Sequence, residues 1–120
     1  FLGEASTLAA NASACANEQS MFWNFHDYMF DQQPDESDTS MYAVENLAQI
    51  AGTLGMDPEQ FTSCLSEKKY DKDVAKDLSD GQGVGVQGTP TVFVNGVAVV
   101  GAVPYAELKK EIDKALEANK

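Results

Sequence analysis

The sequence predicts an α/β chain that is mostly helical and carries one β-hairpin and a final helix near its C-terminus. Three observations predict this class. Through the first two thirds of the chain, apolar residues recur every three or four positions, the spacing of amphipathic helices. Two runs of mainly β-branched residues, 91–94 and 97–100, flank Asn95-Gly96, a pair typical of a two-residue hairpin turn. Pro104 then precedes a last helical stripe.

The helical part is expected to run from the first residues to about Asp80. Asp38 or Thr39 is expected to cap the third helix. Asp57, followed by proline at the first helical position, is expected to start the fourth, which a stripe through Tyr70 either extends or restarts. The predicted apolar faces contain Leu2, Ala5, Leu8, Ala9, Ala12, Cys15 and Ala16; Met21, Phe22, Phe25, Tyr28 and Met29; Val44, Leu47, Ala48, Ala51 and Leu54; and Phe61, Cys64 and Leu65.

The hairpin strands are apolar without alternation, a pattern typical of strands that are covered on both faces. A two-stranded sheet is small for a chain of 120 residues, so the hairpin is interpreted as part of a larger α/β sheet. Its open edges and apolar faces predict a homo-oligomer, formed through the hairpin edge or by swapped helices.

The net charge of −11 lies entirely in the first part of the chain. Residues 1–67 contain eleven acidic residues and no lysine, whereas residues 68–120 contain eight of each sign. Such a chain repels phosphate backbones and anionic lipid, so no nucleic-acid or membrane-surface partner is expected. No apolar run approaches the roughly 20 residues of a membrane helix, so no span is expected.

No motif requires a cofactor or a metal ion, and none is expected. The glycines from Gly83 to Gly88 fit the letters G-x-G-x-x-G, but a helix is predicted before them and a strand after them, the reverse of a dinucleotide site. They are interpreted as part of a flexible connector beginning at Gly81. His26, the single histidine, is interpreted as a packing or helix-surface residue. Residues 31–38 are expected to form an acidic loop, and its carboxylates Asp35, Glu36 and Asp38 are interpreted as a solvated face.

Cys15 and Cys64 are the two cysteines, and they do not form a Cys-x-x-Cys motif. Each lies on the apolar stripe of its predicted helix, where a cysteine is usually a small apolar residue or half of a bridge. From these residues alone, the state of the two cysteines remains open: they could form a disulfide, be two buried thiols, or be neither.

Thr89-Pro90 directly precedes the first strand of the hairpin. A cis bond there would turn the Thr89 backbone outward, where it could pair with an extended peptide. Only about 5–6% of X-Pro bonds are cis, so the residues alone favour trans.

The chain resembles the DsbA-like thiol-disulfide oxidoreductases of the thioredoxin superfamily over essentially its whole length. The residues that carry the resemblance are Gly88-Thr89-Pro90-Thr91-Val92-Phe93-Val94-Asn95-Gly96, Val99-Val100-Gly101-Ala102 and Pro104-Tyr105; Ala14-Cys15-Ala16, Glu18-Gln19, Phe22-Trp23 and His26-Asp27; and Phe61 to Cys64 with Tyr70.

This resemblance implies a thioredoxin-like fold with an inserted helical domain, here incomplete. Residues 1–80 would be the helical insertion, and residues 81–120 the C-terminal part of the thioredoxin-like domain. Thr89 and Pro90 would bind substrate, with Pro90 as the cis-proline, and Cys15 and Cys64 would form a structural disulfide. No catalytic residue is expected in this chain, because the family's catalytic Cys-x-x-Cys would lie before Phe1.

The resemblance also implies an extracytoplasmic oxidoreductase acting on protein or peptide substrates with thiols or disulfides. The leading hypothesis is therefore a fragment of such an enzyme, inactive by itself. A non-catalytic thioredoxin-like peptide-binding or interaction module is the alternative. A third hypothesis makes Cys15 and Cys64 the redox pair.

Overall fold

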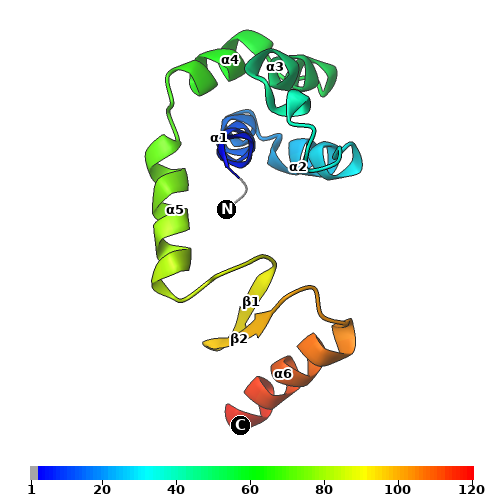
Figure 1. Cartoon of the computed structure of the whole chain (residues 1–120), viewed down its shortest axis with the longest axis vertical. Coiled ribbons are helices and arrows are strands. Elements are labelled where there is room, and N and C mark those ends of the chain that lie inside the picture. The colour runs from blue at the N-terminus through cyan, green and yellow to red at the C-terminus, as the bar shows by residue number, and fades with distance from the viewer. Residues whose placement is uncertain (1–2) are drawn as a thin grey trace. The chain divides into compact units, whose positions relative to one another are not determined.

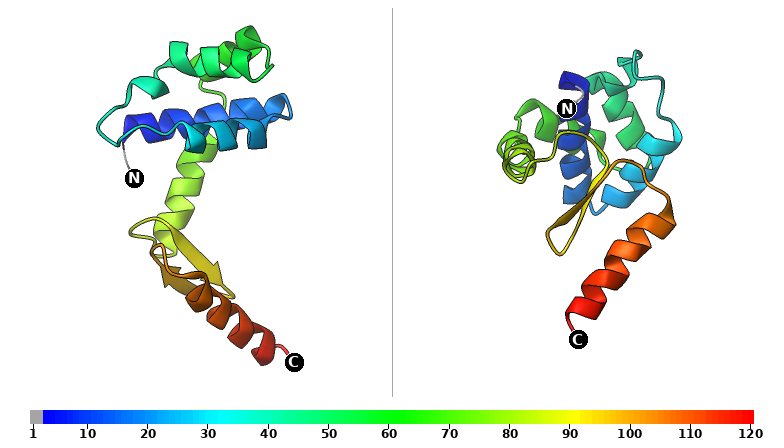
Figure 2. Two further views of the ribbon diagram at one scale, coloured as in Figure 1. Left: turned by 90° about the vertical axis from the view of Figure 1, so that its right-hand side faces the viewer. Right: turned by 60° about the horizontal axis from the view of Figure 1, so that its bottom comes forward.

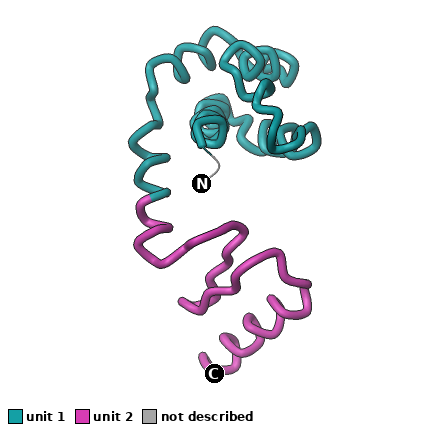
Figure 3. Tube along the Cα trace, viewed as in Figure 1, with its two compact units in different colours: residues 1–78 teal, residues 79–120 magenta. Residues whose placement is uncertain are grey.

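The computed structural model describes residues 3–120. These divide into two compact units, unit 1 (residues 3–78) and unit 2 (residues 79–120) (Figure 3). The elements, in chain order, are α1 (Glu4–Glu18), α2 (Phe22–Asp31), the 3-10 helix η1 (Ser40–Tyr42), α3 (Val44–Thr53), α4 (Pro58–Ser66), α5 (Asp71–Gly83), β1 (Thr91–Val94), β2 (Val97–Val100) and α6 (Tyr105–Ala118) (Figure 1). Within residues 3–120, no helix combines the length and apolarity needed to cross a membrane.

Unit 1 is a helical bundle built around α1, which contacts α2, α3 and α4 (Figure 2). Helices α1 and α2 run antiparallel, side by side, because only a short turn joins them. The core consists of Ala12, Cys15, Ala16, Phe25, Met29, Leu47, Ile50, Ala51, Met56, Phe61, Cys64 and Leu65. Most of these residues belong to the predicted apolar stripes, so the helical periodicity correctly located the buried faces of α1 to α4. Leu2, which was predicted to lie on the first stripe, is outside the described residues.

The start of α4 is confirmed, with Asp57 as its N-cap. The Asp57 carboxylate accepts hydrogen bonds from the backbone N–H groups of Glu59, at 2.9 Å, and Gln60, at 3.2 Å. The Gln19 side chain adds a reciprocal pair: its amide donates to the Asp57 carbonyl at 3.0 Å, and its carbonyl accepts from the Asp57 N–H at 2.7 Å. These bonds fasten the end of α1 to the start of α4.

The predicted cap of the third helix is wrong. The Asp38 carboxylate accepts a hydrogen bond from the Ser40 N–H at 3.0 Å, and this contact begins η1 instead. Ala43 is extended, with ψ 144°, so it separates η1 from α3 and is itself the N-cap, without a side-chain hydrogen bond. A short polar residue that can cap a helix can equally start a 3-10 turn.

The expected flexible connector begins later than predicted, because α5 continues through Gly81 and Gly83. Gly85 ends the helix in the left-handed conformation, with φ 84°. The Val86 N–H donates to the Gly81 carbonyl and the Gly85 N–H to the Gln82 carbonyl, both at 3.0 Å. This is the Schellman arrangement, in which a left-handed glycine satisfies the last carbonyls of a helix. The division between the compact units falls inside this helix, at residues 78 and 79.

Unit 2 contains the predicted hairpin, with β1 and β2 antiparallel and Thr91 paired with Val100. Asn95 and Gly96 both have positive φ, 47° and 85°, as a type I′ turn requires. Helix α6 packs beside β1 (Figure 2). Several apolar side chains of the sheet remain exposed, namely Val92, Phe93, Val97 and Val100. Self-association through this hairpin stays a prediction.

Candidate substrate-binding loop and helical disulfide

Two hydrogen bonds fix the loop before β1 to the hairpin, one spanning Thr89–Pro90 and one accepted by Pro90 itself. The Thr91 hydroxyl donates to the Gly88 carbonyl at 2.7 Å, and the Gly101 N–H donates to the Pro90 carbonyl at 2.8 Å. The Thr89–Pro90 peptide bond is cis. The loop therefore has a defined conformation beside the first strand.

Thr89 and Pro90 are both exposed at this loop. Within residues 3–120, the Thr89 backbone makes no hydrogen bond, while the residues on either side of Thr89–Pro90 are bonded. An exposed, unpaired backbone next to a strand is the kind of site at which an extended peptide can bind. The substrate-binding role of Thr89 and Pro90 stays a prediction.

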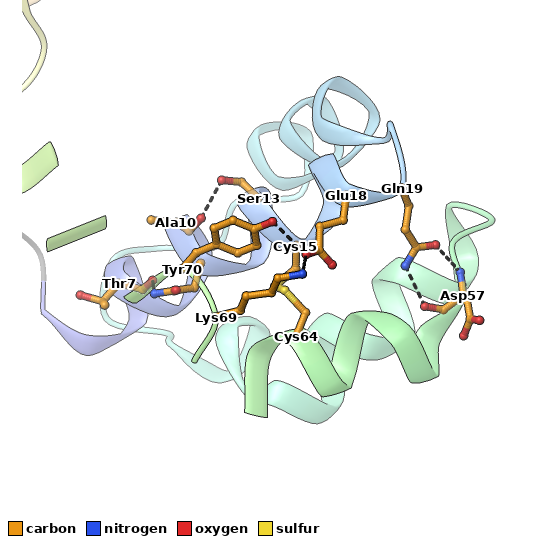
Figure 4. The surroundings of a disulfide bond; sticks show 11 residues. Thr7, Ala10, Ser13, Cys15, Glu18, Gln19, Asp57, Cys64, Lys69 and Tyr70 are labelled. Atoms are coloured by element: carbon orange, nitrogen blue, oxygen red, sulfur yellow. Dashed lines mark hydrogen bonds and ion pairs between the residues drawn. A yellow bond between two sulfur atoms is a disulfide. The ribbon is translucent and has the colours of Figure 1, made fainter. Parts of the chain in front are cut away.

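A disulfide joins Cys15 of α1 to Cys64 of α4, with Cα atoms 5.9 Å apart (Figure 4). The two cysteines are separated by 49 positions in the sequence. They are 1% and 4% exposed, inside the core of unit 1. Because thiol-disulfide exchange requires a thiolate to reach a sulfur atom, this burial protects the bond.

A polar cluster next to the disulfide connects α1 to the segment after α4 (Figure 4). Glu18 accepts a hydrogen bond from the Tyr70 hydroxyl at 2.8 Å and forms an ion pair with Lys69. The hydrogen bond from Lys69, followed by that from Tyr70, holds the pKa of the Glu18 carboxyl below its usual value. The bond to Glu18 raises the pKa of Lys69 and of Tyr70.

The lowered pKa of Glu18 predicts a pH-dependent stability. The ionised carboxylate favours the folded state above the pKa of the unfolded chain, near 4.3, and this contribution is lost as the pH falls through the lower folded value. Glu18→Gln should therefore flatten the decrease in the free energy of unfolding between about pH 6 and pH 3. Urea titrations across this range measure the effect.

The control for this prediction is Glu45→Gln, which removes an exposed carboxylate of α3 outside the cluster. An equal flattening in both variants would contradict the assignment to Glu18. The raised pKa of Lys69 makes stability depend on pH in the opposite direction. The protonated ammonium group stabilises the folded state at neutral pH, and this stabilisation is lost as the pH rises through the pKa that Lys69 has in the folded chain.

His26 lies on α2 and is half-buried. This agrees with the prediction that it is a packing or helix-surface residue. Its Nδ1 lies 3.0 Å from a carboxylate oxygen of Asp27. Its ring makes an edge-to-face contact with that of Trp23, with centroids 5.2 Å apart, and a tilted contact with that of Phe30, with centroids 4.8 Å apart. Within residues 3–120, no three His, Cys, Asp or Glu side chains are grouped so as to hold a metal ion.

The predicted site residues are divided between the two units. Cys15 and Cys64 lie in unit 1, whereas Thr89 and Pro90 lie in unit 2. The interactions of Glu18 with Lys69 and Tyr70 were not predicted, although the resemblance included Glu18 and Tyr70. Lys69 and Tyr70 lie 51 and 52 positions after Glu18 in the sequence, so no local pattern connects them to it.

The disulfide between two helices, the cis-proline loop, the hairpin and the final helix all agree with the expected thioredoxin-like class. The family model described as thioredoxin matches residues 1–114, and the chain belongs to this family.

Among solved structures, the chain is similar to oxidised BdbD from Bacillus subtilis, with a TM-score of 0.83 and 31% identity over 98% of this chain and 64% of that one. The thioredoxin-like fold is therefore confirmed.

The chain is also similar to two curated relatives whose names describe disulfide formation or disulfide oxidoreduction. Disulfide bond formation protein D of Bacillus subtilis is 32% identical over 98% of this chain and 54% of the relative. A putative protein-disulfide oxidoreductase of Rickettsia bellii is 32% identical over 93% of this chain and 43% of the relative. The chain thus spans about half the length of these relatives, and its resemblance to DsbA-like oxidoreductases is confirmed.

Proposed function

We propose that this chain is the substrate-binding and helical part of a thiol-disulfide oxidoreductase that forms or exchanges disulfides in exported proteins. The main observation in support of this function is the similarity to disulfide bond formation protein D over 98% of the chain. The loop at Thr89 and Pro90 supports it, since it places an exposed backbone beside the hairpin of a thioredoxin-like fold.

In disulfide exchange a thiolate attacks one sulfur of a disulfide, a mixed disulfide forms, and the other sulfur leaves as a thiolate. We propose that this chain is part of a longer protein, that the nucleophile belongs to a Cys-x-x-Cys motif preceding Phe1 there, and that the 120-residue chain alone is inactive. Support comes from its cysteines, because Cys15 and Cys64 are bonded to each other and are buried.

The role of residues 88–91 in this proposal is to hold the substrate chain. An extended substrate would form hydrogen bonds with the backbone of Thr89, in the manner of a strand added to a sheet edge. The hydrogen bonds accepted by the Gly88 and Pro90 carbonyls hold the backbone of Thr89 in place between them. Little conformational entropy is therefore lost when the substrate binds.

Titration of the isotope-labelled chain with an extended peptide, followed by NMR, tests this role. The largest shifts are expected at the amides of Gly88, Thr89 and Thr91, with a dissociation constant in the millimolar range. The amide of Lys72, in α5, serves as the internal control. Shifts spread evenly over both units, or absent from the loop, would contradict the proposal.

The proposed site of action is outside the cytoplasm. Disulfides persist in oxidising compartments and are rare in reducing ones, and this chain carries a disulfide of its own. An oxidoreductase that forms disulfides in exported proteins would act in the same compartment.

A further inference from the structure

Unit 1 contains an apolar groove that neither the disulfide nor the loop at Pro90 uses. The groove lies between α1, α2 and the segment of residues 33–42, and its volume is about 450 Å³. This volume is in the range of pockets that enclose ligands or side chains of partners. The apolar residues that line it include Ala9, Phe22, Phe25, Met29, Phe30 and Tyr42.

Large aromatic side chains are exposed at the groove. Phe30 lines it and is 66% exposed. Trp23 makes an edge-to-face contact with the lining residue His26 and is 67% exposed. Aromatic residues carry a large share of the binding energy where proteins meet. Contact with a partner would therefore remove a substantial apolar surface from water.

The groove is also acidic at its rim. Asp35 and Glu36 line it, and Asp27 and Asp31 are exposed on α2. The whole region of residues 1–67 contains no lysine or arginine to offset these carboxylates. The field at the groove therefore attracts cations and repels anions.

We propose that this groove binds a cationic, apolar polypeptide segment, with large apolar side chains in the groove and neighbouring Lys or Arg side chains at the acidic rim. Charge complementarity selects this occupant. A second copy of the chain would bring its own acidic unit 1, and nucleic acid or anionic lipid would bring phosphates, so repulsion disfavours all three. The site is independent of thiol chemistry, and its failure leaves the proposed oxidoreductase function untouched.

Trp23 is the single tryptophan, and its ring contacts that of the lining residue His26, so its fluorescence serves as the probe of binding. The probe is a short peptide of Phe, Leu and Lys without cysteine or tryptophan, titrated into the full 120-residue chain at low salt. A saturable change in Trp23 emission is expected. The same peptide with every Lys replaced by Glu should give no saturable change.

Two variants separate charge from general effects on the fold. Asp35→Asn combined with Glu36→Gln should weaken binding about fivefold, as expected for two partly screened charge pairs. The matched control, Glu59→Gln combined with Glu67→Gln, removes the same charge from exposed positions at α4 and should leave binding unchanged.

Phe30→Ala tests the apolar contact and should weaken binding about tenfold, whereas Leu116→Ala, at an exposed position of α6, should not weaken it. Equal binding of the Lys and Glu peptides would overturn the proposal. So would an equal loss in the two charge variants, or the absence of binding by the Lys peptide. Concentration-dependent dimerisation that protects Trp23 would also overturn it, since a second copy would then be the occupant.

Discussion

Replacing both Cys15 and Cys64 with serine is expected to lower the free energy of unfolding of unit 1 by about 4 kcal/mol. The disulfide closes a long loop, because its cysteines are 49 positions apart. In the chain-entropy model, opening a loop of this length restores that much conformational freedom to the unfolded chain. For a domain of marginal stability, such a loss is a large fraction of the total.

Urea unfolding followed by Trp23 fluorescence measures this effect in unit 1. The wild-type chain unfolded in the presence of a strong reductant is the control, and its midpoint should coincide with that of the double serine variant. If removal of the bridge leaves the midpoint unchanged, the bridge is not structural. A glutathione titration then tests Cys15 and Cys64 as a redox pair, since a structural bridge stays oxidised across the buffer range.

Phe61→Ala is expected to destabilise unit 1 by about 3–5 kcal/mol, the usual cost of removing a buried aromatic ring. Phe61 is 0% exposed on α4, and its ring centroid lies 6.0 Å from that of Phe25 on α2. Removing the ring leaves a cavity where elements of the bundle meet, and the surrounding helices can fill it only in part.

Phe30→Ala is the matched control, because it makes the same substitution at a side chain that is 66% exposed. It should change the free energy of unfolding by less than about 0.5 kcal/mol. Denaturant titrations of the two variants compare the effects. A loss at Phe30 as large as that at Phe61 would contradict the assignment of the core.

The sequence predicted those parts of the fold that depend on local chemistry. Asp57 before Pro58 starts α4 by a capping interaction within three residues, and Asn95-Gly96 forms the turn by its own backbone preferences. Asp38 failed as a cap because a carboxylate can bond to whichever nearby N–H the backbone offers. The Schellman cap at Gly85 was missed, because the preceding glycines resemble a loop.

The candidate sites depended more on resemblance than on local pattern. The residues left the state of Cys15 and Cys64 open, because the meeting of α1 and α4 is a tertiary contact. The groove was missed for the same reason: Asp35 and Glu36 lie in an acidic loop, and only the fold places them beside the aromatic face of α2.

We propose that substrate binding and catalytic chemistry lie in different segments of the protein, and that this chain holds the substrate-binding segment. An insulin-reduction assay of the oxidised, folded 120-residue chain, with disulfide bond formation protein D of Bacillus subtilis as reference, tests it most directly. No turnover above the uncatalysed rate is expected, and the Cys15–Cys64 bond should be intact after the assay. Turnover at a rate comparable to the reference would contradict it.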